Sequence, residues 1–408
     1  MKQYPKYKDS GIQWIGQIPE GWKVQALKYI GDARNGLTYS PLDVTDAGIL
    51  VLRSSNIQDS KLAFKDNVYV KEAPDFLKMK KGDIIICSRN GSLALVGKCV
   101  YIPEDMDAVF GAFMLRYRPH IPNRFIFYVV QEAIRKYKAY YATSTVNQLT
   151  VDVLGRMQVP LPPISEQESI VRYLDDKTAK IDETVNLLEQ QKTDLQQYRK
   201  ALISKTVTRG LNPNAKLKDS GIQWIGQIPE EWETSRIKDI IDMRSGINLP
   251  SEKILSQGKY PVYGGNGIRG YYLEYSNEGD FILIGRQGAL CGNINYASGR
   301  FWATEHAVVC YPKKNLALKW LGELLRTMNL GQYSISAAQP GLSMERIKNL
   351  PIPLPPISEQ QAIADFLDSK TATIDQSIAN IETQIADLRA YRAALISDVV
   401  TGKIDVRN

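Results

Sequence analysis

The sequence contains few of the residues that build metal centres and disulfide frameworks. Among its 408 residues are four cysteines, none of them in a C-x-x-C pair, and only two histidines, His120 and His306. So small and scattered a set predicts neither a zinc site nor a network of disulfides. We therefore expect four small buried thiols in a reducing compartment, and no metal bound by this chain.

Long apolar runs are absent as well. Residues 1–9 contain no apolar core of the kind that a secretory signal needs, and no later run reaches membrane-spanning length. The composition is that of an ordinary globular protein, and the length allows two or three domains. These features predict a cytoplasmic protein without membrane contact.

Recognisable catalytic motifs are also lacking. Residues 265–270 match the letters of a dinucleotide-binding fingerprint, but they lie between two tyrosine-rich segments and do not open a helix that could bind pyrophosphate. Residues 91–98 are one residue too long for a phosphate-binding loop, and Cys99 stands where a magnesium-binding hydroxyl is needed. No nucleophile has a base at a familiar spacing. The chain is therefore predicted to be non-catalytic.

What the sequence does contain is a long internal repeat. The phrase Leu161-Pro-Pro-Ile-Ser-Glu-Gln167 returns 193 residues later as Leu354-Pro-Pro-Ile-Ser-Glu-Gln360, which indicates duplicated structural units. Because two prolines cannot continue a preceding helix, each phrase predicts a helix start. The pattern of the residues that follow predicts capping boxes at 165–168 and 358–361, that is, Ser165 with Glu168 and Ser358 with Gln361.

The two predicted helices, residues 165–205 and 358 to about 400, each carry apolar residues spaced by sevens. The seam comprises Leu174, Ile181, Leu188, Leu195 and Leu202 in the first helix and Leu367, Ile374, Ile381, Leu388 and Leu395 in the second. Such spacing is typical of a coiled coil. The most economical partner for each helix is the other copy, and chain order then makes the pair antiparallel with one globular domain at each end. The alternative is a pair of bundle helices within one compact domain.

A second repeated phrase, which we call the anchor, opens each globular segment. Residues 9–22 return as residues 219–232 with one change, Gly21 becoming Glu231. The anchor recurs after 210 residues and the helical phrase after 193, so the difference in length lies between them. Each anchor holds two tryptophans, which we expect to pack a domain edge against the helices; stacking on a nucleic-acid base is the alternative.

Between anchor and helix only a skeleton of the repeat survives. Residues 82–93 correspond to residues 279–290, and both read as a turn, an apolar strand and a turn that bears an arginine and an amide. An amphipathic helix, around residues 123–141 and 316–330, then precedes a polar loop. Arginine can bond guanine, and Asn or Gln can bond adenine, although the same side chains also satisfy turns and cap helices. The candidate DNA-binding residues are Arg89, Asn90, Ser92, Ser144, Thr145, Asn147, Gln148, Tyr263, Asn266, Arg269, Arg286, Gln287, Ser336 and Gln339.

In combination, these features resemble the specificity subunit of type I restriction-modification systems. The resemblance covers nearly the whole chain and rests on the doubled Pro-Leu-Pro-Pro-Ile-Ser-Glu-Gln phrase, the doubled Ala-Leu-Ile-Ser helix ending and the doubled Ile-Gln-Trp-Ile-Gly anchor. It implies two target recognition domains, residues 1–157 and 211–350, each reading one half of a bipartite, asymmetric sequence in double-stranded DNA. The remaining residues, 158–210 and 351–408, would be the conserved helical spacers. A net charge of +7 suits a polyanionic partner without establishing one.

The resemblance also implies partners. Two modification subunits would dock on the helices, bind S-adenosylmethionine and methylate adenine, and two restriction subunits would use ATP and Mg for translocation and cleavage. No cofactor is expected on this chain, which lacks the Asn/Asp-Pro-Pro-aromatic motif of adenine methyltransferases; Ile164 and Ile357 follow its own Pro-Pro pairs. Rival hypotheses are a coiled-coil adaptor whose end domains bind proteins, and a specificity protein whose modification genes are lost.

The expected fold is therefore α+β. It comprises two globular, mixed α/β target recognition domains separated by a long antiparallel two-helix coiled coil, with an internal pseudo-two-fold repeat.

Overall fold

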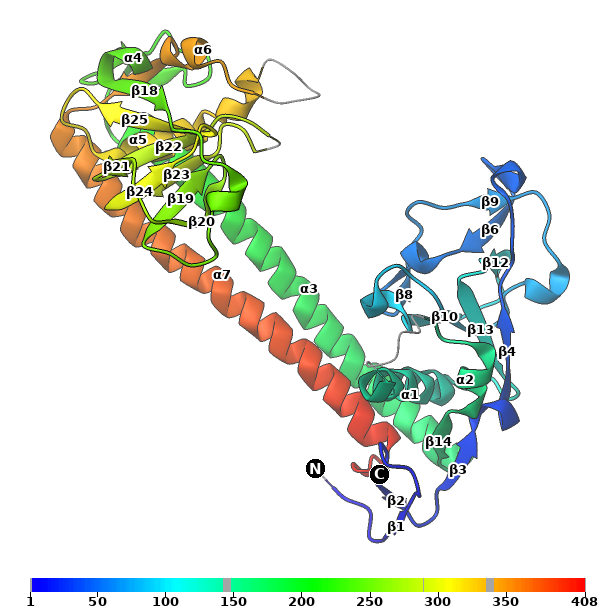
Figure 1. Cartoon of the computed structure of the whole chain (residues 1–408). Helices are drawn as coiled ribbons and strands as arrows, with labels where there is room; N and C mark the ends of the chain where they lie inside the picture. Colours follow the sequence, from blue (N-terminus) through cyan, green and yellow to red (C-terminus); the bar gives the residue numbers. More distant parts are fainter. Residues whose placement is uncertain (1, 142–147, 289, 335–340, 408) are drawn as a thin grey trace. The chain divides into compact units, whose positions relative to one another are not determined.

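The chain folds into two compact units (Figure 1), which we describe from a computed structural model that covers residues 2–141, 148–288, 290–334 and 341–407. The first unit comprises Met1–Leu187 and Gln384–Asn408, and the second comprises Leu188–Thr383. Two long helices each contribute one part to the first unit and one part to the second.

An antiparallel four-stranded sheet forms the centre of the first unit. Its strand order is β11-β10-β13-β4, with bounds β4 Gly31–Asn35, β10 Ile84–Cys87, β11 Cys99–Tyr101 and β13 Met114–Pro119. Both faces of β10 are covered: Ile84 and Ile86 enter one hydrophobic cluster, whereas Ile85 and Cys87 enter another. This is the alternation that a strand imposes, and it explains why an uninterrupted apolar run forms a central strand.

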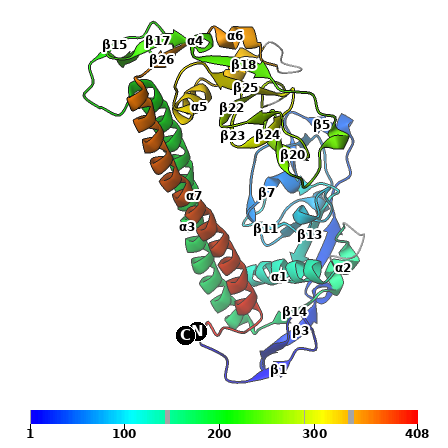
Figure 2. The same cartoon turned by 60° about the vertical axis from the view of Figure 1, so that its left-hand side comes forward.

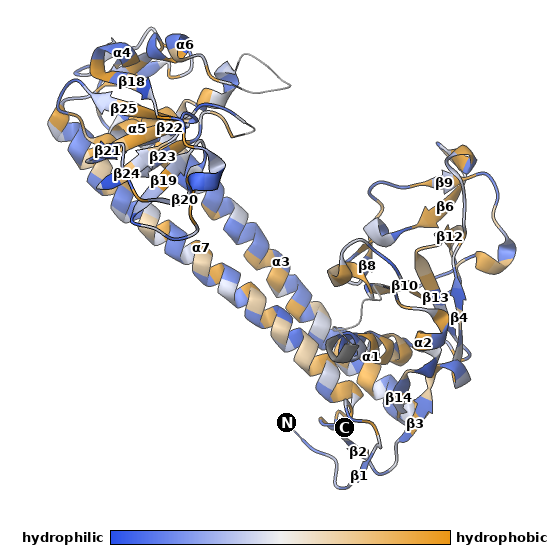
Figure 3. Ribbon diagram, in the orientation of Figure 1, coloured by the Kyte–Doolittle hydropathy of each residue, from blue (hydrophilic) through white to orange (hydrophobic). Residues whose placement is uncertain are grey.

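A second sheet, with order β12-β6-β9-β5, packs in the second of those clusters. Its strands are β5 Val44–Thr45, β6 Ile49–Leu52, β9 Tyr69–Val70 and β12 Ala108–Phe110, and β12 pairs with β6 in parallel. A short hairpin of β7 (Ile57–Gln58) and β8 (Lys61–Leu62) extends from the same region. The strands carry much of the hydrophobic colour of this unit in Figure 3.

The second unit repeats this plan. Its antiparallel sheet has the equivalent order β23-β22-β25-β18, formed by β18 Ile241–Ser245, β22 Phe281–Gly285, β23 Ile294–Ala297 and β25 Ala307–Pro312. Its other sheet, β20-β19-β24-β21, again contains one parallel pair, β19 with β24. The strands of that sheet are β19 Tyr260–Gly264, β20 Gly267–Tyr272, β21 Asn277–Glu278 and β24 Arg300–Ala303. The internal repeat seen in the sequence is thus a repeat of topology.

Short strand pairs close each globular domain. The first anchor folds as β1 (Tyr7–Asp9) against β2 (Gln17–Pro19), and the next strand, β3 (Lys23–Ala26), pairs with β14 (Gln158–Leu161), which immediately precedes the helical phrase. The same pairs recur in the second unit as β15 (Leu217–Asp219) with β16 (Gln227–Pro229), and β17 (Glu233–Arg236) with β26 (Pro351–Leu354). Each domain therefore begins and ends on neighbouring antiparallel strands.

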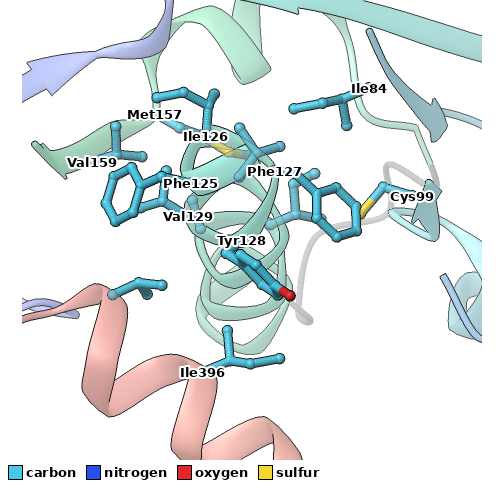
Figure 4. Packing of buried hydrophobic residues seen from close by; sticks show 14 of the residues in the cluster. Ile84, Cys99, Phe125, Ile126, Phe127, Tyr128, Val129, Met157, Val159 and Ile396 are labelled. Carbon is cyan, nitrogen blue, oxygen red and sulfur yellow. The ribbon is translucent and has the colours of Figure 1, made fainter. Parts of the chain in front are cut away.

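Helix α1 (Arg124–Tyr141) fills the space between the sheet and the long helices of the first unit (Figure 4). Phe125, Val129 and Phe127 belong to one buried cluster with Ile84 of β10 and with Ile396 of a long helix. In the second unit α5 (Leu318–Thr327) contributes Trp320, Leu321 and Leu324 in the same way. The other α-helices of the globular domains are short: α2 Val151–Arg156, α4 Ile237–Ile240 and α6 Met344–Lys348.

The two long helices are α3 (Ile164–Arg209) and α7 (Ile357–Val400), which lie side by side in Figures 1 and 2. The predicted capping boxes are wrong. Pro163 accepts hydrogen bonds from the N–H groups of Glu166 and Gln167, at 2.9 and 3.0 Å, so the proline occupies the capping position and Ser165 lies inside the first turn. Pro356 caps α7 in the same manner, through Glu359 and Gln360.

The predicted seam faces inward in both helices. Six of its residues are buried, namely Leu174, Ile181, Leu367, Ile374, Ile381 and Leu395, and the other four, Leu188, Leu195, Leu202 and Leu388, are half-buried. In the first unit the beginning of α3 packs with the end of α7, and Arg392 binds Asp182 at 2.9 Å. In the second unit Arg199 binds Asp375 at 2.8 Å.

These two ion pairs are the same contact with the repeats exchanged, because both the aspartates and the arginines are 193 residues apart. Residues that oppose each other in an antiparallel pair have numbers with a constant sum. That sum is 574 for both ion pairs, so α3 and α7 keep one antiparallel register between them. The predicted fold class is therefore confirmed. The predicted domain boundaries at residues 157, 210 and 350 remain a prediction.

Candidate nucleic-acid interface

One edge of the antiparallel sheet, which we call the loop end, gathers the four described candidate residues of the first unit and two of the five in the second, Arg286 and Gln287. In the first unit β10 ends at Cys87, β13 begins at Met114 and β4 ends at Asn35. Because neighbouring strands run in opposite directions, these three termini meet at one edge. The equivalent residues of the second unit are Gly285, Ala307 and Ser245.

The backbone at the loop end is held in the same way in both units. The N–H of Arg89 donates to the carbonyl of Phe113 at 3.2 Å, and the N–H of Arg286 donates to the carbonyl of His306 at 2.9 Å. A third strand approaches so closely at Gly36 that a Cβ there would lie 2.2 Å from the carbonyl oxygen of Gly111. The same approach at Gly246 would place a Cβ 2.3 Å from the carbonyl oxygen of Ala303. Only glycine fits at these crossings, which fixes the loops relative to each other.

In the first domain, Arg89 is exposed and its guanidinium lies 5.6 Å from the centre of the Phe113 ring. Asn90 is half-buried: its amide donates to Ser54 Oγ at 3.2 Å and its carbonyl oxygen accepts from the N–H of Ser92 at 3.0 Å. Gln148 is exposed and forms a β-bridge with Arg89. The structure thus brings Arg89, Asn90, Ser92 and Gln148 together, and uses part of the Asn90 amide to shape the turn.

A cleft of about 1440 Å³ opens at this loop end. Arg53 contributes one wall; its guanidinium donates to the carbonyl of Asp66, while its buried Nε has no partner among the described residues. The cleft combines two arginines, an amide, hydroxyls and an exposed aromatic ring, which are the groups that contact base edges and phosphates. The residues lining it are Leu37, Thr38, Tyr39, Pro41, Val44, Arg53, Ser54, Ser55, Asp66, Val68, Arg89, Asn90, Gly91, Gly111, Ala112, Phe113 and Met114.

In the second domain, Arg286 is half-buried and donates through Nη1 to Ser245 Oγ at 3.1 Å. Gln287 is exposed and forms a β-bridge with Gly341, as Gln148 does with Arg89. The two domains therefore present an arginine at the same strand end, next to an amide side chain, as the sequence predicted.

Residues 265 and 266 form the turn between β19 and β20, and residues 267–270 belong to β20 itself, so this segment is not the strand-to-helix turn of a dinucleotide site. Arg269 is exposed on this hairpin, and the carbonyl oxygen of Asn266 accepts from the amide of Asn293 at 2.5 Å. Tyr263 lies in β19, and its ring packs edge to face on Phe301, with centroids 5.5 Å apart. Burial raises the pKa of Tyr263. Its ring thus serves the domain core, and a DNA contact by Tyr263 stays a prediction.

Five of the candidate residues, Ser144, Thr145, Asn147, Ser336 and Gln339, fall outside the residues that the structure describes.

Sequence reasoning missed three residues at the loop ends: Arg53, Phe113 and His306. The chain turns back into β13 and β25 directly after Phe113 and His306, whose separation of 193 residues equals the offset of the helical phrase. That offset could have aligned them. Their backbone bonds to the strand-end arginines could not have been foreseen, because they depend on pairing between distant strands.

The repeated phrases join each domain to the long helices. Trp22 is fully buried and donates its indole N–H to the Glu166 carboxylate at 3.1 Å, and Tyr4 donates to the same carboxylate. Trp232 donates likewise to Glu359 at 2.7 Å. These anchor tryptophans pack against the helices, as predicted, whereas Trp224, the other tryptophan of the second anchor, remains 39% exposed.

The glutamine of each phrase holds the domain helix. Gln167 accepts from the Asn123 amide at 2.8 Å, one residue before α1, and Gln360 accepts from the N–H of Ala317 at 3.2 Å, one residue before α5. Ion pairs reinforce both joints: Arg124 with Asp175 at 3.2 Å, and Lys319 with Asp368 at 2.8 Å. The start of each domain helix is thus tied to a long helix by a hydrogen bond and an ion pair.

All four cysteines are free and buried, as predicted. Within the described ranges, no three His, Cys, Asp or Glu residues are grouped so as to hold a metal ion. No helix of the described parts of the chain is long and apolar enough to cross a membrane.

Comparison with known proteins places this architecture in a family. The profile of the type I restriction modification DNA specificity domain matches residues 19–196 and again residues 229–386. The chain belongs to this family and contains two copies of its domain. Its role is accordingly that of a DNA specificity subunit in a type I restriction-modification system.

Individual relatives agree along most of the chain. The putative type I restriction enzyme MjaX specificity subunit of Methanocaldococcus jannaschii is 25% identical over 96% of each chain. The EcoKI specificity subunit of Escherichia coli K12 is 22% identical over 95% of this chain and 90% of its own. The EcoprrI specificity subunit of Escherichia coli is 41% identical, but over only 37% of this chain and 38% of its own.

Two solved structures share the fold. A chain from a study of complex assembly and conformational transition in the type I R-M system superposes with a TM-score of 0.73, at 18% identity, covering 95% of this chain and 99% of its own. The HsdS subunit of Thermoanaerobacter tengcongensis gives a TM-score of 0.51 at 19% identity, covering 95% of this chain and 98% of its own.

Proposed function

We propose that each globular domain reads one half of a bipartite, asymmetric DNA sequence through its loop end, and that α3 and α7 set the spacer between the halves. The observation that supports this most directly is the repeated loop end: two domains hold an arginine at the same strand terminus on the same backbone frame, with different neighbours. A shared backbone arrangement with different side chains suits two domains that bind DNA in the same way and recognise different base sequences.

The chain itself acts without catalysis in this proposal, and the chemistry belongs to partners. Two modification subunits dock on the helices and methylate adenine in the recognised sequence, and two restriction subunits join them. The support is the family membership and the solved relative, whose study concerns the assembly of the type I system. The basic excess of the chain, +7, favours association with a polyanion.

The test is methylome sequencing of cells that express this chain with its candidate modification subunit, compared with the same cells lacking the chain. We expect a bipartite N6-methyladenine motif with a fixed spacer, present only with the chain. Methylation that is unaffected by removing the chain, despite a demonstrated complex, would refute the proposal and favour a protein-binding adaptor.

A further inference from the structure

Phe113 and His306 occupy equivalent positions in the two copies of the repeat, 193 residues apart. Each is the last residue before the strand that pairs with the arginine-bearing strand, and each accepts the N–H of that arginine through its own carbonyl, at 3.2 Å for Phe113 and 2.9 Å for His306. Both backbones are fixed by this bond and by the neighbouring glycine crossing. The side chains, by contrast, are free to differ.

Both side chains are presented outward. The Phe113 residue is 62% exposed and lines the cleft of the first domain, beside the Arg89 guanidinium. The side chain of His306 is 38% exposed, and its Nε2 lies 3.1 Å from the Glu305 carboxylate. Phe113 does not belong to any of the described hydrophobic clusters of its unit, so packing of the core does not account for its ring.

The two rings differ in the base contacts they can make. A phenyl ring offers an apolar surface that suits the methyl group of thymine, and it bonds no base edge. An imidazole can donate to or accept from the purine and pyrimidine edges. The arginine at each strand end, Arg89 or Arg286, supplies the common contact, to guanine or to phosphate.

We propose that Phe113 and His306 are base-contacting residues that make the two half-sites different: Phe113 makes an apolar contact with a thymine methyl, and His306 makes a polar contact with a base edge. This inference rests on the proposed function and adds the identity of one discriminating position in each domain.

The experiment compares Phe113→His and His306→Phe with the unchanged chain, each co-expressed with the modification subunit and analysed by methylome sequencing. We expect Phe113→His to shift the preference at one base of one half-site by about tenfold or more. We expect His306→Phe to shift one base of the other half-site. In each variant the untouched half-site and the spacer should stay the same, which reports on folding and assembly within the same measurement.

Two further variants sharpen the result. Phe64→His alters a phenylalanine of the first unit that is 54% exposed and does not line the cleft, and it should leave the motif unchanged. Phe113→Leu retains an apolar contact and should preserve the base preference better than Phe113→His.

The outcomes separate the two proposals. If the unchanged chain directs no bipartite methylation, the proposed function fails. If it does, but both ring exchanges leave every position of the motif unchanged, the inference about Phe113 and His306 is overturned. Equal loss on all sequences in Phe113→His and Phe113→Leu, with the same unfolding temperature as the unchanged chain, overturns it too, because a phosphate or positioning contact would then account for the ring.

Discussion

At the scale of the residue, the Glu166 carboxylate joins the anchor to the first helical phrase. It accepts from the Trp22 indole and the Tyr4 hydroxyl in a buried setting. Glu166→Ala should therefore lower the free energy of unfolding by about 1.5–3 kcal/mol, since both donors lose a charged acceptor. Glu168→Ala changes an exposed glutamate in the same turn and should stay within about 0.5 kcal/mol. Denaturant unfolding of both variants checks this; equal effects would contradict it.

The burial of two thiols predicts how the free energy of unfolding changes at alkaline pH. Complete burial raises the pKa of Cys99 and of Cys310 to about 12. Between about pH 9 and 12 the unfolded chain loses these protons while the folded chain keeps them. The free energy of unfolding should therefore fall as pH rises through this window, by up to about 1.4 kcal/mol per pH unit for each thiol.

Urea titrations at stepped pH, for the unchanged chain and for Cys99→Ala with Cys310→Ala, measure this effect. The variant should show a smaller alkaline loss. In addition, iodoacetamide at pH 8 should leave both thiols of the folded chain unmodified, and rapid labelling of either would contradict their burial.

At the scale of the element, the long helices are held by their apolar seam more than by their ion pairs. Leu367 is fully buried, whereas the side chains of Arg199 and Asp375 are 30% and 53% exposed. We expect Leu367→Ala to destabilise the second unit by about 2–5 kcal/mol, and Asp375→Ala by at most about 1 kcal/mol. Thermal unfolding distinguishes them, and a larger loss for Asp375→Ala would show that the ion pair is the stronger contact.

Sequence alone predicts elements better than it predicts contacts. The apolar run 84–87 indicated β10, and the apolar residues spaced by sevens indicated α3, because both patterns are local in the sequence. The capping boxes failed because each helix begins at the isoleucine before the serine, so that the serine lies inside the first turn and the proline carbonyl accepts the free N–H groups. Arg89 and Arg286 were found because the strand before them is repeated. Phe113 and His306 were missed because they share no residue type and meet the arginines only through strand pairing.

At the scale of the whole molecule, helix length is predicted to determine the spacer. Insertion of one heptad after Gln190 and another after Thr383, which correspond in the repeat and oppose each other in the shared register, keeps the seam in phase. Seven helical residues add about 10 Å, so the spacer should lengthen by about three base pairs while both half-sites stay unchanged. Methylome sequencing measures it, and an unaltered spacer would contradict a helical ruler.

The strand after each anchor, β3 or β17, pairs with the strand before each helical phrase, β14 or β26. Nearly identical phrases flank both domains, so the sequence contains two pairs of matching segments around two divergent ones. A domain exchanged between these phrases would keep the tryptophan–glutamate joint to the helices, because Trp22, Trp232, Glu166 and Glu359 all lie in the phrases. Under the proposed function, exchange of one domain as a unit would give a new target sequence without the gradual alteration of a binding surface.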